Sequence, residues 1–210
     1  MENLIKRYPI LNGVKEEITA AYELLRTTYA NGGKLLLCGN GGSAADCDHI
    51  VGELMKSFKL KRPISDALTS TLNDMGEYGQ FIAPLLEKPL TAISLCEHNS
   101  LTTAYANDRY PDTVFAQQLL GYGKNGDVLL ALTTSGNSNN CIYAATLAKA
   151  MGIRVISITG VDGGKITSLS DVSIKLPEAE TYLVQELTLP IYHYICAKLE
   201  KHFFGHIKTE

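Results

Sequence analysis

The sequence predicts an α/β fold in which helices cover both faces of a parallel β-sheet. Three observations lead to this prediction. Short apolar runs alternate with longer segments that repeat apolar residues at helical spacing. The apolar runs are nearly continuous, as expected for strands that are buried on both faces. Several of them end in glycine-rich turns that precede a helical segment, which is the order of a strand–loop–helix fold.

Five apolar runs are the expected strands: residues 34–38, 89–95, 127–133, 153–159 and 171–177. Helices are expected over residues 14–30, from Ser43 to about Phe58, over 99–106 and 112–120, from about Asn139 to Met151, and from about Glu180 to Phe203. Ser43 is the candidate N-cap of the second helix. Pro190 indicates a kink in the last helix. No element is assigned to residues 59–88.

Length and composition favour a single domain over residues 1–210 that is an ordinary globular protein. Of its 210 residues, 45% are hydrophobic and 20% are charged, and the formal net charge of −3 argues against nucleic-acid binding. No apolar run approaches the roughly 20 residues of a membrane span, and the N-terminus lacks the pattern of a signal peptide. The five cysteines form no CxxC pair, which indicates free thiols in the cytoplasm.

The first predicted helix is amphipathic and has little to cover within one sheet. We therefore expect residues 1–32 to form an N-terminal helical arm that packs against a neighbouring subunit. This expectation makes the protein a homo-oligomer.

Two glycine-rich loops suggest an anion site. "GNGGS" (39–43) and "TTSGNS" (133–138) each follow a strand and precede a helix. Glycine lets the backbone approach a ligand, and amides at a helix N-terminus attract phosphate. Ordinary turns capped by Ser43 and Ser138 are the alternative. A nicotinamide cofactor is a third possibility because "GNGGSA" matches G-x-G-x-x-A, but no strand ends in an acidic residue roughly 20 positions later, as that fingerprint requires.

Two predicted helices carry polar side chains among apolar ones. His49 and Glu53 are four residues apart and share a face of the second helix. Gln185 and His193 lie among leucines and isoleucines of the last helix. If the helices meet, the four side chains could hold a divalent metal such as zinc, or Glu53 and His193 could act as a general acid–base pair. The spacing does not decide between these roles, and a surface pair with a buried structural histidine remains the alternative.

These residues resemble the sugar-isomerase (SIS) domain, and in particular its phosphoheptose isomerase branch. The matching segments are "CGNGGSAADCDHIVGEL", "AND" (106–108), "TTSGNSNN", "TGVDGGK" and "ETYLVQELTLPIYHYIC", which occur in order across most of residues 34–200. The resemblance implies a flavodoxin-like three-layer sandwich that assembles as a homotetramer with active sites at subunit interfaces. It also implies reversible conversion of sedoheptulose 7-phosphate to D-glycero-D-manno-heptose 7-phosphate through an enediol.

The resemblance also implies roles for individual residues. Glu53 and His193 would be the catalytic proton-transfer pair, and zinc would bind His49, Glu53, Gln185 and His193. The substrate contacts would come from both loops, the "AND" segment and the last helix: Asn40, Gly41, Gly42, Asn107, Asp108, Thr133, Thr134, Ser135, Ser138 and Gln185.

The sequence departs from the family pattern at three places, one of which is Tyr182–Leu183, where polar or basic residues are more usual before the glutamine. Thr188 stands where many members have a second histidine, and Pro63–Lys88 is longer than the usual connection. These departures motivate an alternative function, a non-catalytic SIS module that binds a sugar phosphate or a protein partner.

Overall fold

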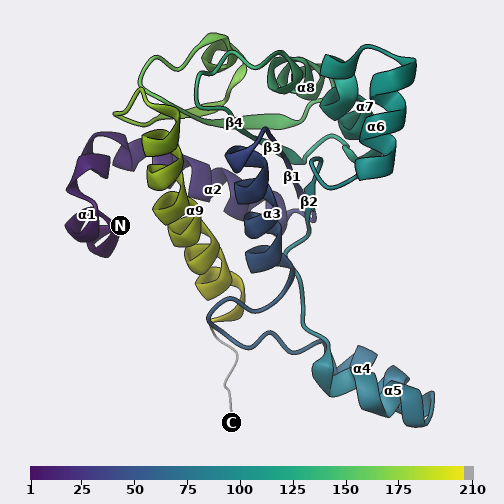
Figure 1. The fold of residues 1–210 in the computed structure, drawn as a ribbon. Helices are drawn as coiled ribbons and strands as arrows, with labels where there is room; N and C mark the ends of the chain where they lie inside the picture. Colours follow the sequence, from purple (N-terminus) through teal and green to yellow (C-terminus); the bar gives the residue numbers. More distant parts are fainter. Residues whose placement is uncertain (206–210) are drawn as a thin grey trace.

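The computed structural model describes residues 1–205 and confirms the predicted α/β architecture (Figure 1). Its sheet has five parallel strands in the order β2-β1-β3-β4-β5, the order of flavodoxin-like folds. The strands are β1 (Leu35–Gly39), β2 (Ala92–Ser94), β3 (Val128–Leu132), β4 (Arg154–Thr159) and β5 (Val172–Lys175). Each of them lies within a predicted strand, apart from Gly39 at the end of β1.

The helices also follow the prediction in most places. They are α1 (Glu2–Arg7), α2 (Lys15–Ala30), α3 (Gly42–Met55), α4 (Asp66–Asp74), α5 (Glu77–Ile82), α6 (Asn99–Asp108), α7 (Val114–Tyr122), α8 (Asn139–Ala150) and α9 (Thr181–Phe204). Short 3-10 helices are η1 (Pro9–Val14), η2 (Ala83–Leu85), η3 (Pro111–Thr113) and η4 (Lys165–Leu169). In residues 1–205 no helix combines the length and the apolar character that crossing a membrane requires.

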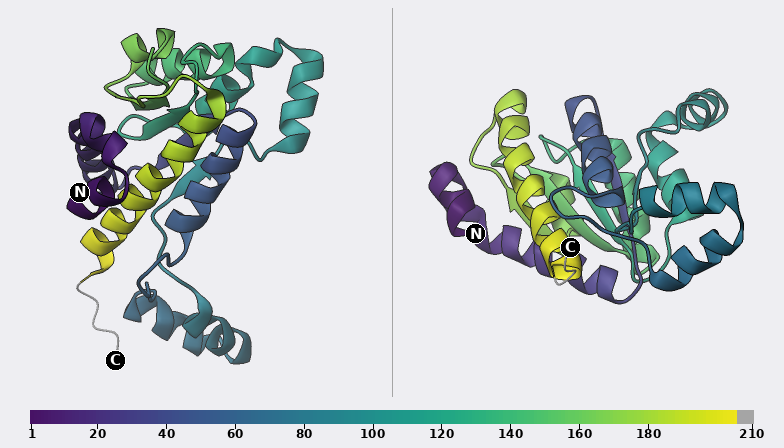
Figure 2. Two further views of the ribbon diagram at one scale, coloured as in Figure 1. Left: turned by 60° about the vertical axis from the view of Figure 1, so that its left-hand side comes forward. Right: turned by 90° about the horizontal axis from the view of Figure 1, so that it is seen from below.

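Alternating strand residues build a separate core on each face of the sheet. Leu35 and Leu37 of β1 pack in the core beneath α2, α3 and α9, whereas Leu36 and Cys38 pack in the core beneath α7 and α8. This alternation is the two-residue period of a strand, and it explains why the strands read as continuous apolar runs. Figure 2 shows the resulting three layers.

The expectation that the 14–30 helix has little to cover in its own chain is wrong. Ile18, Ala21 and Leu25 of α2 are buried in the same core as β1 and α9. The helix therefore completes a layer of its own domain. Its contribution to a subunit interface stays a prediction.

The helix N-termini differ from the prediction at two serines. α3 begins at Gly42 with Gly41 at the N-cap position, so Ser43 lies inside the helix. Gly41 has a φ of 56°, a backbone conformation that favours glycine. Ser138 does precede α8, but its side chain caps no backbone amide and instead accepts a hydrogen bond from Thr133 Oγ1 at 3.1 Å.

Residues 64–86, to which the sequence assigned no element, form a helical hairpin that we call the arm. It contains α4, α5 and η2, and it extends away from the α/β body in Figure 1 and in the left view of Figure 2. Its base is closed by an antiparallel bridge between Pro63 and Glu87.

Candidate active site

The facing sides of α3 and α9 bring together three side chains that the sequence singled out. His49 and Glu53 of α3 and His193 of α9 each offer a ligand atom, and these atoms all lie within 4.8 Å of one another. His49 Nε2 is 3.1 Å from Glu53 Oε1. The rings of His49 and His193 meet edge to face, with centroids 5.0 Å apart. The predicted convergence of the two helices is therefore observed within one chain.

The cluster contains polar atoms without protein partners. Glu53 Oε2 and His193 Nε2 are buried and form no hydrogen bond within residues 1–205. Burial, followed by the nearby His49, lowers the pKa of His193, against the opposing effect of Glu53. A buried polar atom without a partner is costly. A ligand that bonds to these atoms would remove that cost.

His49 is held by side chains outside the predicted site. Its Nδ1 lies 2.9 Å from the hydroxyl oxygen of Tyr192, and that hydroxyl is 3.2 Å from Asp46 Oδ1. If the hydroxyl donates to Asp46, Nδ1 of His49 can donate to the hydroxyl and leave Nε2 with a free lone pair. This chain of hydrogen bonds can thus fix the tautomer that a metal ligand or a base requires.

A buried ion pair anchors the backbone that carries Glu53. Arg62 donates to the carbonyl oxygens of Glu53 and Leu54 at 3.1 and 2.7 Å, and so satisfies the last turn of α3. Its Nε bonds to Glu200 on α9 at 2.8 Å. Both side chains are almost completely buried. The pair therefore ties the end of α3 to α9 close to the cluster.

The loop of residues 133–138 forms a hydroxyl-lined turn at the start of α9. Its Thr134 Oγ1 is 3.5 Å from Thr181 Oγ1 of α9. The start of η4 supports this turn, because the amide of Ile166 donates to the carbonyl oxygen of Gly136 and the amide of Lys165 donates to Asn137 Oδ1. Ser135 is exposed and Thr134 half-buried, so this turn can receive an anion.

Gln185, the fourth predicted metal ligand, contacts the first loop. Its side-chain amide packs on the first loop, where a Cβ on Gly42 would come within 2.8 Å of it. His193 is eight residues further along α9, about 12 Å of helix rise. The side chains of His49, Glu53 and His193 therefore converge, and the amide of Gln185 contacts the start of α3.

The predicted substrate-binding asparagines and aspartate form hydrogen bonds among themselves or with α8. Asn40 exchanges two side-chain hydrogen bonds with Asn140 of α8, at 3.0 and 2.8 Å. Asn107 and Asp108 bond to each other at the exposed end of α6, and no contact with the cluster is seen. Thr188 is buried and donates to the carbonyl of Val184, so the position of the missing family histidine faces away from the site.

Tyr192, Asp46, Arg62 and Glu200 support the site and were missed by the sequence interpretation. The only signal available was the presence of charged or polar residues in otherwise apolar segments. Their partners lie between 8 and 146 residues away in the chain, and periodicity within one helix cannot reveal such distant pairs.

The donor set is suited to a metal ion. Two imidazole nitrogens and a carboxylate oxygen are common ligands of divalent transition metals, and Glu53 Oε2 and His193 Nε2 are the atoms without partners. Together with the hydroxyl-lined turn, this arrangement can bind a metal ion and an anion on the same side of the molecule.

Comparisons with known proteins give the class and then the family. Residues 8–80 and 79–160 match the SIS domain, so the fold and site define a SIS-domain protein. Phosphoheptose isomerases of Helicobacter pylori strain P12 and of Aneurinibacillus thermoaerophilus are both 37% identical to this chain, over 92% and 91% of it and over 88% and 89% of their own length. The chain belongs to the phosphoheptose isomerase family.

Solved structures agree with this assignment. A phosphoheptose isomerase from Neisseria gonorrhoeae superposes with a TM-score of 0.74 at 31% identity, and one from Francisella tularensis with a TM-score of 0.76 at 27% identity. Each alignment covers 95% of this chain and 94% of the other chain. The resemblance seen in the sequence motifs is confirmed.

Proposed function

We propose that this chain is a ketose–aldose isomerase that interconverts sedoheptulose 7-phosphate and D-glycero-D-manno-heptose 7-phosphate. The observation that carries the proposal is the convergence of Glu53 and His193 with His49, all within 4.8 Å. The names of relatives that share over 30% identity with the chain support the substrate.

The reaction moves a carbonyl group between C2 and C1 through an enediol. Glu53 is placed to take the proton from one carbon as a carboxylate and to return it to the other. The lowered pKa of His193 keeps its imidazole neutral near pH 7. It can therefore accept or deliver the proton that moves between the two oxygens.

Along α9, the rise between the hydroxyl-lined turn and His193 is longer than an extended seven-carbon sugar phosphate, and the direction of the His193 side chain reduces the difference. Thr181, beside the hydroxyl-lined turn, and His193 are twelve residues apart, about 18 Å of helix rise. Side chains on a helix lean toward its N-terminus, so the imidazole of His193 shortens this gap. Six C–C bonds of about 1.5 Å and the phosphoester give the extended substrate a reach on the order of 10 Å.

In this arrangement the phosphate occupies the turn of residues 133–138, with hydroxyls from Thr133, Thr134, Ser135 and Ser138. The first loop, Asn40–Gly42, and Gln185 then border the middle of the sugar. Asn107 and Asp108 would bind its hydroxyls. Because they lie away from the cluster, they reach the substrate only if α6 moves or belongs to a neighbouring subunit.

Zinc is the metal we propose for this site. His49, Glu53 and His193 would hold it, with Gln185 as the fourth ligand that the family resemblance implies. When bound, the ion would supply positive charge that stabilises the enediolate oxygen.

We also propose that the protein is a cytoplasmic homotetramer with sites at subunit interfaces, and that it binds neither nucleic acid nor membrane. All five cysteines are free, which suits a reducing compartment. The negative net charge argues against nucleic-acid binding.

The test is incubation of the purified protein with sedoheptulose 7-phosphate, with the aldose phosphate as the measured product. Glu53→Gln and His193→Asn should abolish turnover and leave substrate-dependent thermal stabilisation in place. Stabilisation by the sugar phosphate without turnover in the wild-type protein would instead identify a non-catalytic SIS module.

A further inference from the structure

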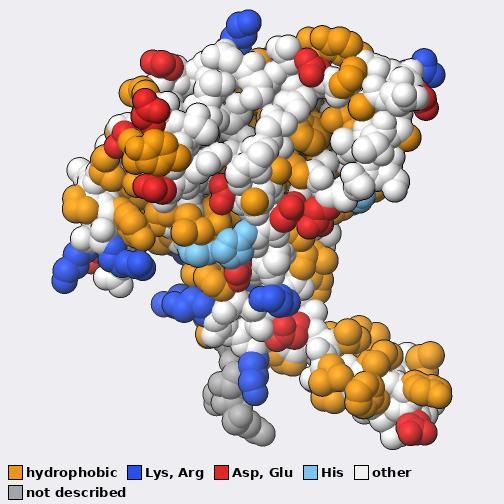
Figure 3. Space-filling model, in the orientation of Figure 1, with side chains coloured by type: hydrophobic (Ala, Val, Ile, Leu, Met, Phe, Trp, Pro, Cys, Tyr) orange, Lys and Arg blue, Asp and Glu red, His pale blue; other side chains and the backbone are white. Residues whose placement is uncertain are grey.

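The arm (residues 64–86) has an apolar surface that its own chain does not cover. Among residues 64–86 only Gly79 and Ala83 are buried. Seven of the seventeen large hydrophobic side chains exposed in residues 1–205 belong to it: Leu68, Met75, Tyr78, Phe81, Ile82, Leu85 and Leu86. Figure 3 shows this hydrophobic surface at the lower right. Concentrated exposure of this kind marks an interaction site.

The arm is also too small to be stable without further contacts. α4 has nine residues and α5 has six, lengths at which an isolated helix is marginal in water. No residue of α4 is buried. Packing against another surface is therefore needed to keep the hairpin folded.

A groove on the same chain has the complementary character. It has a volume of about 710 Å³, lies between α1 and α9, and reaches His193. Its apolar lining includes Leu4, Phe58 and Leu189, and its cationic lining is Lys6, Arg7 and Lys59.

Charge favours contact between the arm and this groove. The arm carries Asp66, Asp74 and Glu77 and contains no lysine or arginine. Within residues 1–205 neither these carboxylates nor the three cations of the groove form an ion pair with any other side chain. The arm is thus acidic and apolar, and the groove between α1 and α9 of the same polypeptide is basic and apolar.

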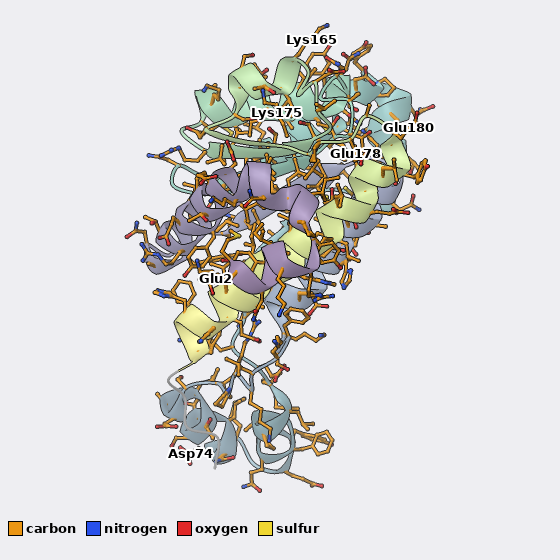
Figure 4. The ribbon with its side chains drawn as sticks, turned by 90° about the vertical axis from the view of Figure 1, so that its left-hand side faces the viewer. Glu2, Asp74, Lys165, Lys175, Glu178 and Glu180 are labelled. Carbon is orange, nitrogen blue, oxygen red and sulfur yellow. The ribbon has the colours of Figure 1, made fainter. Side chains whose placement is uncertain are left out.

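The arm cannot reach the groove of its own chain. α4 and α5 lie on the opposite side of the body from α1 in Figure 2, and in Figure 4 Asp74 lies well below Glu2 of α1. A second copy offers the same groove without this constraint. In a two-fold symmetric pair, each arm could occupy the other copy's groove.

We propose that the arm of one chain docks in the groove between α1 and α9 of a second copy, beside that copy's His193. This inference rests on the proposed homo-oligomer and adds the surfaces that meet. Docking covers the apolar arm and neutralises the groove's cations. It also closes the active site on its His193 side, so the arm becomes part of its neighbour's site.

The test is photo-cross-linking of the full-length protein with p-benzoylphenylalanine at Tyr78, a side chain that is 86% exposed. Mixing ¹⁴N and ¹⁵N copies distinguishes cross-links between chains from those within one. We expect mixed-isotope dimers whose cross-linked peptides come from residues 1–8, 58–59 or 189–197. The same probe at Tyr110, which is 59% exposed on the body, should give no cross-link to these peptides.

Charge reversal provides a second measurement. Asp74→Lys with Glu77→Lys should weaken association by about tenfold, and combining them with Lys6→Glu and Arg7→Glu should restore the cross-link. Circular dichroism checks that each variant is folded. Cross-links confined to one chain, cross-links to another surface, or no restoration by the combined variant would overturn the proposal. None of these readouts depends on catalysis, so an inactive protein would contradict the isomerase function alone.

Discussion

The buried pair of Arg62 and Glu200 offers a direct test of how α3 is held against α9. Glu200 accepts hydrogen bonds from three backbone amides, those of Phe58, Lys59 and Leu60, at 2.8 to 3.1 Å, as well as from Arg62 Nε. Glu200→Gln removes the charge and turns part of the acceptor into a donor that faces these amides. Arg62 then remains buried without its counter-ion.

Breaking a buried ion pair by removing one partner costs about 3–5 kcal/mol. With a urea m-value of about 3 kcal/mol/M, the unfolding midpoint of Glu200→Gln should fall by roughly 1 to 1.7 M. Because oligomers gain stability with concentration, both proteins are compared at the same concentration. The matched control is Glu16→Gln, since the Glu16 side chain is 71% exposed and its pairing with Lys15 is at 3.6 Å. The control should leave the midpoint unchanged.

A double replacement sharpens the test. Replacing a whole buried ion pair by apolar residues is often neutral. Here Arg62→Met with Glu200→Leu should recover only part of the loss, because three backbone amides still lack their acceptor. A midpoint for Glu200→Gln within about 0.3 M of the wild type, or full recovery in the double variant, would refute the role given to Glu200.

Three further outcomes are expected. Gly42→Ala places a methyl group 2.8 Å from the amide of Gln185 and should raise KM more than it lowers kcat, measured by steady-state kinetics; an unchanged KM would contradict this. Tyr192→Phe removes the hydroxyl that orients the imidazole of His49, and it should weaken Co²⁺ binding about tenfold in an absorbance titration. Equal Co²⁺ affinity of the variant and the wild type would show that the hydroxyl is dispensable. Cys96 should be the first thiol to react with iodoacetamide, because a hydrogen bond from Cys47 lowers its pKa. Its reaction rate should therefore level off at a lower pH than that of a free thiol, and faster labelling of another cysteine would refute this.

The sequence was sufficient to predict the sheet, because each strand is an apolar run buried on both faces. It also identified the pair of His49 and Glu53, whose spacing on one helix is local information. The arm was not predicted, because its helices have only nine and six residues and are separated by Gly76, so neither gives a long periodic segment. The contact between Tyr192 and His49 was equally hidden, since it joins residues 143 positions apart.

Ser43 shows a different limit of sequence interpretation. A serine beside glycines is a reasonable N-cap, but Gly41 adopts a positive φ and α3 begins one residue earlier than predicted. The conformational freedom of the glycine backbone at the N-cap position outweighed the preference of serine for that position. Predictions of helix boundaries at glycine-rich loops are therefore less secure than predictions that the helix exists.

Solvent exchange during turnover tests the central claim most directly, namely that Glu53 moves a proton between two carbons of the sugar. The reaction is run in D₂O with sedoheptulose 7-phosphate, and mass spectrometry and NMR follow deuterium at C1 and C2. Wild-type protein should incorporate deuterium, and Glu53→Gln should incorporate none while still binding the sugar phosphate. Undiminished exchange in Glu53→Gln would contradict the account.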